Sequence, residues 1–247
     1  YRSHYGLDID PERILVTPGG SGALLLASSL LVDPGRHWLL ADPGYPCNRH
    51  FLRLVEGGAQ LVPVGPQTAY QLTPALVGQH WNNDSVGALV ASPANPTGTV
   101  LDAGELAALS QSLHARGGHL VVDEIYHGLT YGMDAPSVLQ VDDEAFVLNS
   151  FSKYFGMTGW RLGWLVAPPQ AVPELEKLAQ NLYISASSIA QHAALAEKVA
   201  DLADAEELDL AAAEAAEEEA SEKVDALDRE LVPYRESRLA HEAVRLD

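Results

Sequence analysis

Segments with the sequence pattern of buried strands alternate along this chain with segments that have the sequence pattern of helices. Residues 119–126, HLVVDEIY, form a nearly continuous apolar run, which is typical of a strand covered on both faces of a parallel sheet. Residues 21–32 and 102–118 read as helices, and Asp102 is the expected N-cap of the second one. The alternation predicts an α/β fold with a doubly wound, mostly parallel sheet flanked by helices. The other expected strands are residues 12–19, 37–46, 59–65, 86–98, 144–153 and 161–168.

Five of the expected strands end in glycine-rich or polar residues. In open sheets of this class, ligands bind at the carboxyl ends of the strands, where such groups come together. The sequence therefore predicts one site that is assembled from separate segments, namely Gly19–Gly22, Gly44–Tyr45, Asn95–Gly98, Asp123–Tyr126 and Ser150–Lys153.

Composition excludes several classes of protein. The net charge of −19 is opposite to the basic charge expected of a nucleic-acid-binding protein. The sequence contains no run of eighteen apolar residues, so no membrane span is predicted. The first ten residues lack a signal-peptide pattern and Cys47 is the single cysteine, so we expect a cytoplasmic protein without an internal disulfide. The nine histidines form no HExxH arrangement, so no metal is expected, and His127 receives no role.

Taken one at a time, most of these segments also have a plain structural interpretation. The Gly19–Gly22 turn opens a helix, whose bare N–H groups and dipole favour an anion, but most such turns only connect elements. Asn95 before a proline is ordinary turn chemistry, and so is the loop that contains Tyr45. A carboxylate at Asp123, after a buried strand, is costly unless it is paired, and its alternative role is to cap the next element.

The most specific pattern is SFSKYFGMTGWRLGW, which begins at Ser150. It places Lys153 directly after Ser152 and before a glycine-rich turn, with Arg161 eight positions further on. A Schiff-base cofactor enzyme needs such an arrangement, because an amine must reach an aldehyde while neighbouring groups hold the phosphate of the cofactor. The guanidinium group suits that phosphate as a charged fork.

The motifs resemble, in type and in order, those of the fold-type I, class I/II aminotransferases, whose cofactor is pyridoxal 5′-phosphate (PLP). The resemblance covers roughly residues 1–200. It implies that Lys153 forms a Schiff base with PLP, that Asp123 pairs with the pyridine nitrogen, and that Asn95 and Tyr126 donate to the phenolic oxygen. It also implies that Tyr45 stacks on the ring. The phosphate-binding residues that it implies are Gly20, Ser21, Ser150, Ser152 and Arg161.

The reaction that the resemblance implies is the transfer of an amino group between an amino acid and a 2-oxo acid. Lys153 would act as the general base at the substrate α-carbon, with Asp123 and Tyr126 as the other catalytic residues. The resemblance also implies a homodimer, because active sites of the family lie at a subunit interface, and Tyr183 with residues 185–188 are candidates for that interface. Two alternatives remain open: a PLP-dependent C–S lyase or decarboxylase on the same scaffold, and a non-catalytic PLP-binding regulatory module.

The resemblance divides the chain into two parts. Residues 1–185 correspond to the PLP-binding large domain, which is incomplete at its N-terminus. Residues 186–247 correspond to an acidic helical linker and the start of the small domain, most of which is missing by this comparison. No arginine can be assigned to clamp the substrate carboxylate. The Ala- and Glu-rich composition of residues 204–223 favours a solvated helix or a poorly specified segment, and the functional alternative is a structural helix that joins two domains.

Overall fold

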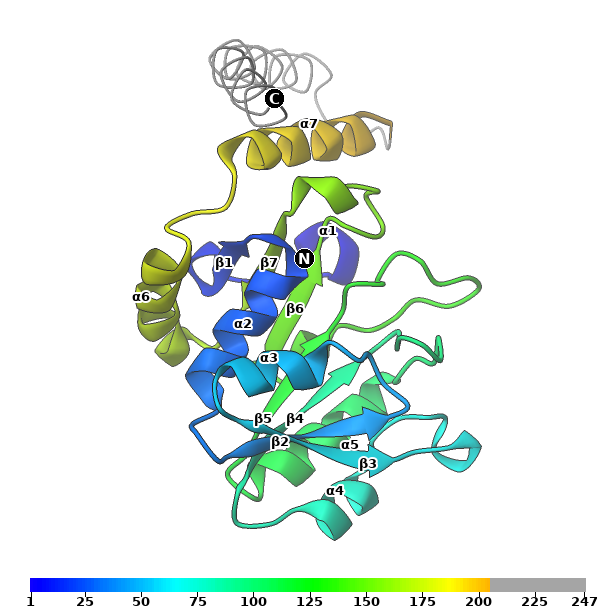
Figure 1. Ribbon diagram of the computed structural model, residues 1–247. Coiled ribbons are helices and arrows are strands. Elements are labelled where there is room, and N and C mark those ends of the chain that lie inside the picture. The colour runs from blue at the N-terminus through cyan, green and yellow to red at the C-terminus, as the bar shows by residue number, and fades with distance from the viewer. Residues whose placement is uncertain (205–247) are drawn as a thin grey trace, which may run out of the picture. The chain divides into compact units, whose positions relative to one another are not determined.

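The computed structural model describes residues 1–204, and the chain divides into two units, Tyr1–Ala186 and Ser187–Asp247. The first unit is built on one seven-stranded sheet with helices on both faces (Figure 1). The described part of the second unit contains helix α7 (Ser188–Asp204). The acidic segment 204–223 lies outside the described residues apart from Asp204, and so does most of the predicted second domain.

The order of hydrogen-bonded strands in the sheet is β1-β7-β6-β5-β4-β2-β3. The neighbouring pairs from β6 to β3 are parallel, whereas β7 runs antiparallel to both β6 and β1. The predicted fold class, a mostly parallel α/β sheet, is therefore confirmed. The strands are β1 (Ile14–Thr17), β2 (His37–Asp42), β3 (Gly58–Pro63), β4 (Ser85–Ala91), β5 (His119–Asp123), β6 (Phe146–Ser150) and β7 (Gly163–Val166).

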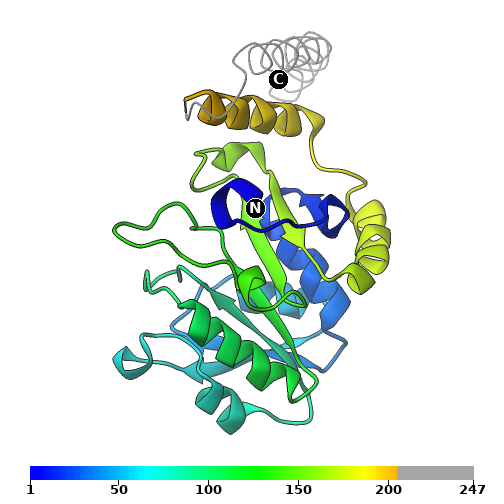
Figure 2. The ribbon, with the colours of Figure 1, turned by 180° about the vertical axis from the view of Figure 1, so that it is seen from behind.

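Two helical layers cover the sheet, as Figures 1 and 2 show from opposite sides. Helices α2, α3 and α6 pack on the face to which Val121 of β5 points, and α4 and α5 pack on the face of Leu120 and Val122. Successive side chains of a strand point to opposite faces, so a strand covered on both sides is apolar throughout. The helices of this unit are α1 (Arg2–Tyr5), α2 (Gly19–Leu31), α3 (Asn48–Leu54), α4 (Pro74–His80), α5 (Ala103–His114) and α6 (Val172–Leu182).

The predicted start of α5 is confirmed by its capping. The Asp102 carboxylate accepts a hydrogen bond from the Glu105 amide at 2.8 Å, and the Glu105 carboxylate accepts one from the Asp102 amide at 2.9 Å. This reciprocal pair satisfies two amide groups of the first turn, which the helix itself leaves free. The helix ends at His114, four residues before the predicted end at residue 118.

Candidate active site

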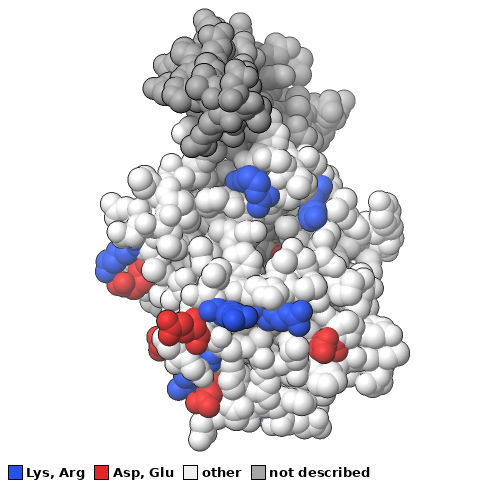
Figure 3. All heavy atoms as spheres, viewed as in Figure 1, with Lys and Arg blue, Asp and Glu red and all other residues white. Residues whose placement is uncertain are grey.

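Five parts of the first unit surround a cavity of about 260 Å³: the N-terminus of α2, the loop after β2, and the carboxyl ends of β4, β5 and β6. Figure 3 shows the face on which the surface is hollowed, with basic side chains around the hollow. All the predicted site residues except Ser150 line this cavity. They are Gly20, Ser21, Tyr45, Asn95, Asp123, Tyr126, Ser152, Lys153 and Arg161.

One side of the cavity carries the groups that favour an anion. Helix α2 begins at Gly19, and its N-cap residue, Pro18, provides no side-chain hydrogen bond to the first amides. The Arg161 guanidinium lies against this turn, because a Cβ atom placed on Gly19 would come within 2.5 Å of its Nη2 atom. Free amides at a helix N-terminus and a guanidinium together form a site for a phosphate group.

The two serines of the Lys153 motif occupy different depths. Ser152 lines the cavity, and its hydroxyl lies 3.5 Å from Arg161 Nη1. Ser150 is fully buried behind it, where its hydroxyl oxygen lies 2.9 Å from Ser152 Oγ and also 2.9 Å from the Leu162 carbonyl oxygen. Ser150 therefore holds Ser152 in place, while Ser152 and Arg161 face the cavity.

The amine of Lys153 lies among groups from neighbouring strand ends. Its Nζ atom is 5.6 Å from the centre of the Tyr126 ring, which is within reach of a cation–π contact. The Tyr126 hydroxyl in turn accepts a hydrogen bond of 3.4 Å from Asn95 Nδ2. The structure thus brings Asn95, in the loop after β4, and Tyr126, in the turn after β5, together beside the lysine.

Asp123 ends β5 and lines the same cavity. Its carboxylate accepts one hydrogen bond within the described residues, from the Ile125 amide at 3.1 Å. Burial raises the pKa of Asp123 to about 6, against the opposing effects of that hydrogen bond and of the Lys153 charge. A cationic partner in the cavity would stabilise its ionised form.

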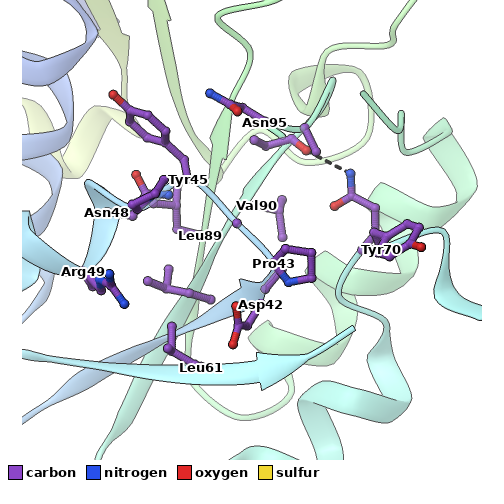
Figure 4. Close-up of a pocket in the computed structure, with 17 residues that line it drawn as sticks. Asp42, Pro43, Tyr45, Asn48, Arg49, Leu61, Tyr70, Leu89, Val90 and Asn95 are labelled. Carbon is purple, nitrogen blue, oxygen red and sulfur yellow. Dashed lines mark hydrogen bonds between the residues drawn. The ribbon is translucent and has the colours of Figure 1, made fainter. Parts of the chain in front are cut away.

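Tyr45 stands between this cavity and a second one of about 210 Å³. The hydrogen bond with Cys47 raises the pKa of the Tyr45 hydroxyl, and burial adds to the effect. Figure 4 shows the second cavity, with Tyr45 and Asn95 in the upper part of the view and Asp42 and Leu61 in the lower part. The two cavities share Tyr45, Asn48, Ala91 and Asn95.

The groups around the first cavity fit PLP. The α2 amides, Ser152 and Arg161 suit its phosphate, and the Lys153 amine suits its aldehyde. The carboxylate of Asp123 lines the cavity and has a single hydrogen bond in the described part of the chain, so it suits a protonated pyridine nitrogen.

Sequence reasoning missed several residues of the cavity. Ile125 lies between two predicted residues on the same turn, and Thr158 lies inside the Lys153 motif, where its hydroxyl donates to the Ser152 carbonyl at 2.6 Å. Position within these motifs was the signal that could have found both residues. The α3 residues Asn48 and Phe51 carried no comparable signal, because they enter the cavity only through the packing of their helix.

No group of three or more His, Cys, Asp or Glu side chains among the described residues is arranged to hold a metal ion. Within the same residues, no helix is both long and apolar enough to cross a membrane.

Residues 1–235 match the family model for aminotransferase class I and II. The valine–pyruvate aminotransferase of Mycobacterium tuberculosis is 40% identical over 198 residues, which are 79% of this chain and 50% of that protein. The (5-formylfuran-3-yl)methyl phosphate transaminase of Methanocaldococcus jannaschii is 34% identical over the same shares. The aspartate aminotransferase of Geobacillus stearothermophilus is 32% identical over 77% of this chain and 50% of that protein. The chain thus spans about half the length of these curated relatives.

Solved structures show the same relationship. An aminotransferase from Mycobacterium tuberculosis superposes with a TM-score of 0.74 at 40% identity, over 77% of this chain and 50% of that one. A Thermus thermophilus aspartate aminotransferase mutant superposes with a TM-score of 0.77 at 29% identity, over 94% of this chain and 63% of that one. The sheet, the cavity and these matches agree, and the chain belongs to the class I and II aminotransferases, a family whose cofactor is PLP.

Proposed function

We propose that this chain is the cofactor-binding part of a PLP-dependent aminotransferase, which moves an amino group between an amino acid and a 2-oxo acid. The observation that carries the proposal is that Lys153, Asp123 and Arg161 line the same cavity. Each of these side chains suits a different group of PLP, namely the aldehyde, the ring nitrogen and the phosphate. Membership of the family supports the same reaction.

In this proposal, the phosphate is bound by the first turn of α2, at Gly20 and Ser21, together with Ser152 and Arg161. Ser150 supports the phosphate site through its hydrogen bond with Ser152. Tyr45 provides the aromatic ring against which the pyridine ring stacks. These contacts orient the cofactor before any substrate arrives, which lowers the entropic cost of the reaction.

The catalytic roles follow from the remaining groups. Bound PLP supplies an aldehyde that combines with amines and a ring that accepts electrons from the substrate α-carbon. The Nζ atom of Lys153 would hold the aldehyde of the cofactor and, as a free amine, would accept a proton from the α-carbon of the substrate. The carboxylate of Asp123 holds a proton at the ring nitrogen, and Asn95 and Tyr126 donate to the phenolic oxygen.

The names of the curated relatives differ in substrate, so the proposal extends to the reaction class and to no particular amino acid. No observation within the described residues favours the C–S lyase, the decarboxylase or the regulatory module. We also propose that residues 1–185 are the PLP-binding domain and that residues 186–247 lead into the small domain.

A homodimer and a cytoplasmic location belong to the same proposal. Family membership supports the homodimer, with Tyr183 and residues 185–188 as candidate interface residues. Sedimentation equilibrium of the purified chain would test it, and a monomer at all concentrations would contradict it. The single thiol of Cys47 supports a reducing compartment, which cell fractionation would test.

The direct test of the function is reductive trapping. The purified chain is mixed with PLP and reduced with borohydride, and the modified peptide is mapped by mass spectrometry. The sequence contains four lysines, Lys153, Lys177, Lys198 and Lys223, so the map is unambiguous. We expect one pyridoxyl adduct at Lys153, and none after Lys153→Arg.

Lys177 is the matched internal control, because it is exposed and paired with Glu174 outside the cavity. No adduct, or equal labelling of Lys153 and Lys177, would overturn the proposal. Turnover is then measured with a panel of amino acids and 2-oxo acids, and absence of any amino transfer by a loaded chain would reject the aminotransferase reaction.

A further inference from the structure

A buried hydrogen-bonded group lies directly behind the turn that carries Asp123 and Tyr126. Its centre is His127, whose side chain is 4% exposed. Tyr126 lines the cavity, whereas the next residue, His127, points into the protein and contacts Ser92 and Tyr5. The roles assigned above to the cavity residues do not involve this histidine.

The hydrogen bonds of His127 determine its tautomer. Its Nε2 atom lies 2.8 Å from the Ser92 carbonyl oxygen, which can only accept, so Nε2 carries the proton. Its Nδ1 atom lies 2.5 Å from the Tyr5 hydroxyl and accepts from it. Burial lowers the pKa of His127 to about 4, so the ring is neutral near pH 7 and both bonds persist.

Glu124 and His4 are the titratable groups that face this ring besides Tyr5. The Glu124 carboxylate is fully buried and accepts from the Val138 amide at 2.8 Å, and its other oxygen lies 3.7 Å from His127 Nδ1. Burial raises the pKa of Glu124 to about 8, so near pH 7 it is neutral like the histidine. The two side chains therefore form no ion pair, and Nδ1 remains free to accept from Tyr5.

Through Ser92 the histidine connects two strand ends. The Ser92 amide donates to the Asp123 carbonyl at 3.1 Å, and the Ser92 carbonyl accepts from His127. Ser92 begins the loop that carries Asn95, while His127 follows Tyr126 on the adjoining turn. These two bonds tie the loop to the turn and so set the 3.4 Å contact between Asn95 and Tyr126.

We propose that His127, held in one tautomer by Tyr5, is a positioning residue that keeps Asn95 and Tyr126 directed together at the phenolic oxygen of PLP. The proposal rests on the function proposed above. Donors at that oxygen withdraw charge from it, and so lower the affinity of the neighbouring nitrogen of the Lys153 linkage for a proton. Losing their alignment therefore raises the pH at which bound PLP changes its visible absorbance.

The test is a pH titration of the visible absorbance of the PLP-loaded chain. His127→Leu removes both hydrogen bonds and is expected to raise the midpoint by about half to one pH unit, the effect of weakening one hydrogen bond. His127→Gln keeps a donor for the Ser92 carbonyl and is expected to restore the wild-type midpoint. Tyr5→Phe removes one hydroxyl, so it preserves folding best, and is expected to shift the midpoint less in the same direction.

His80→Leu is the matched control, because this histidine lies at the end of α4 and lines neither cavity. Midpoints that stay at the wild-type value in both His127→Leu and Tyr5→Phe would overturn the proposal, and so would an equal shift in His127→Gln. If the wild-type chain shows no band of bound PLP, the proposed function fails instead. Nitrogen-15 NMR of the His127 imidazole then tests the positioning role separately. A proton on Nδ1 would overturn that role, because Nδ1 could then not accept from Tyr5.

Discussion

At the level of single residues, the cavity region contains carboxyl groups that are costly to remove from water. A ligand of opposite charge would compensate this cost. The Asp123 carboxyl has a raised pKa because it is taken out of water without a full set of hydrogen-bond donors. Glu124, next to it in the chain, has a raised pKa for the same reason. Placing Asp123 at this position therefore lowers the stability of the folded chain, and it provides a carboxylate that would bind a cation strongly.

This cost predicts the effect of Asp123→Asn on the chain without PLP. Because the folded-state pKa is raised from 3.8 to about 6, the folded state binds the proton more tightly than the unfolded state does. The wild type thus loses stability as pH rises through this window, and the asparagine variant does not. We expect Asp123→Asn to be more stable by about 1 to 3 kcal/mol at pH 8 and no more stable at pH 4.

Urea unfolding at the two pH values measures the difference. Asp42→Asn, at the exposed end of β2, is the matched control and should change little at either pH. A variant that is less stable than the wild type at pH 8 would contradict the expectation. The same Asp123→Asn variant should bind PLP more weakly, because it cannot pair with the charged ring nitrogen.

At the scale of elements, the anion site depends on how closely β7 approaches the start of α2. Gly163 is the first residue of β7, and a Cβ atom on it would lie 2.6 Å from the Gly19 carbonyl carbon and 2.8 Å from the Gly20 amide nitrogen. Both contacts are with backbone, which cannot move aside as a flexible side chain can. The strand thus sets the position of the first amides of α2, which belong to the proposed phosphate site.

Gly163→Ala should therefore displace the first turn of α2. We expect at least about a tenfold loss of PLP affinity and a loss of about 1 to 3 kcal/mol of stability, which is typical of forcing an extra methyl group into a packed region. Gly159→Ala is the matched control, since a Cβ atom there would have no neighbour within 4 Å. Fluorescence titration with PLP and urea unfolding measure the two effects, and wild-type affinity in Gly163→Ala would contradict the role of this contact.

At the scale of the whole molecule, a strongly acidic chain provides a local site for an anion. The net charge is −19, yet Lys153 and Arg161 line the cavity. Thirteen of the 34 acidic residues lie in residues 201–230, away in sequence from the cavity residues. Because exposed charges are screened over about 8 Å in physiological salt, the nearby cations and amides decide which ligand binds.

Binding of PLP should stabilise the folded chain as a whole. A ligand that binds only the folded state adds about 2.7 kcal/mol at a concentration of 100 times its Kd. We expect the midpoint of urea unfolding to rise with PLP concentration in the wild type and in Lys177→Ala, and to rise much less in Lys153→Ala. A midpoint that does not respond to PLP, or an equal rise in Lys153→Ala, would show that the ligand does not bind at this cavity.

Local sequence patterns were enough to predict the seven strands, the fold class and nine of the residues that line the cavity. Apolar runs marked the strands, glycine and proline marked their ends, and parallel strands bring their carboxyl ends to one edge of the sheet. The spacing from Ser150 to Arg161 was specific for the same reason, since one segment between β6 and β7 brings Ser152, Lys153 and Arg161 to the cavity.

The folded structure alone shows the order of the strands, the antiparallel direction of β7 and the contacts of the residues behind the cavity. The segment between β6 and β7 holds the Lys153 motif and one short 3-10 helix, so it returns beside β6 rather than crossing a face as an α-helix would. His127 forms hydrogen bonds with Ser92 and Tyr5, which lie far from it in the chain. Ser150 is likewise buried, in contact with Leu162 across the loop. Such contacts arise from the packing of whole elements, so local sequence patterns cannot predict them.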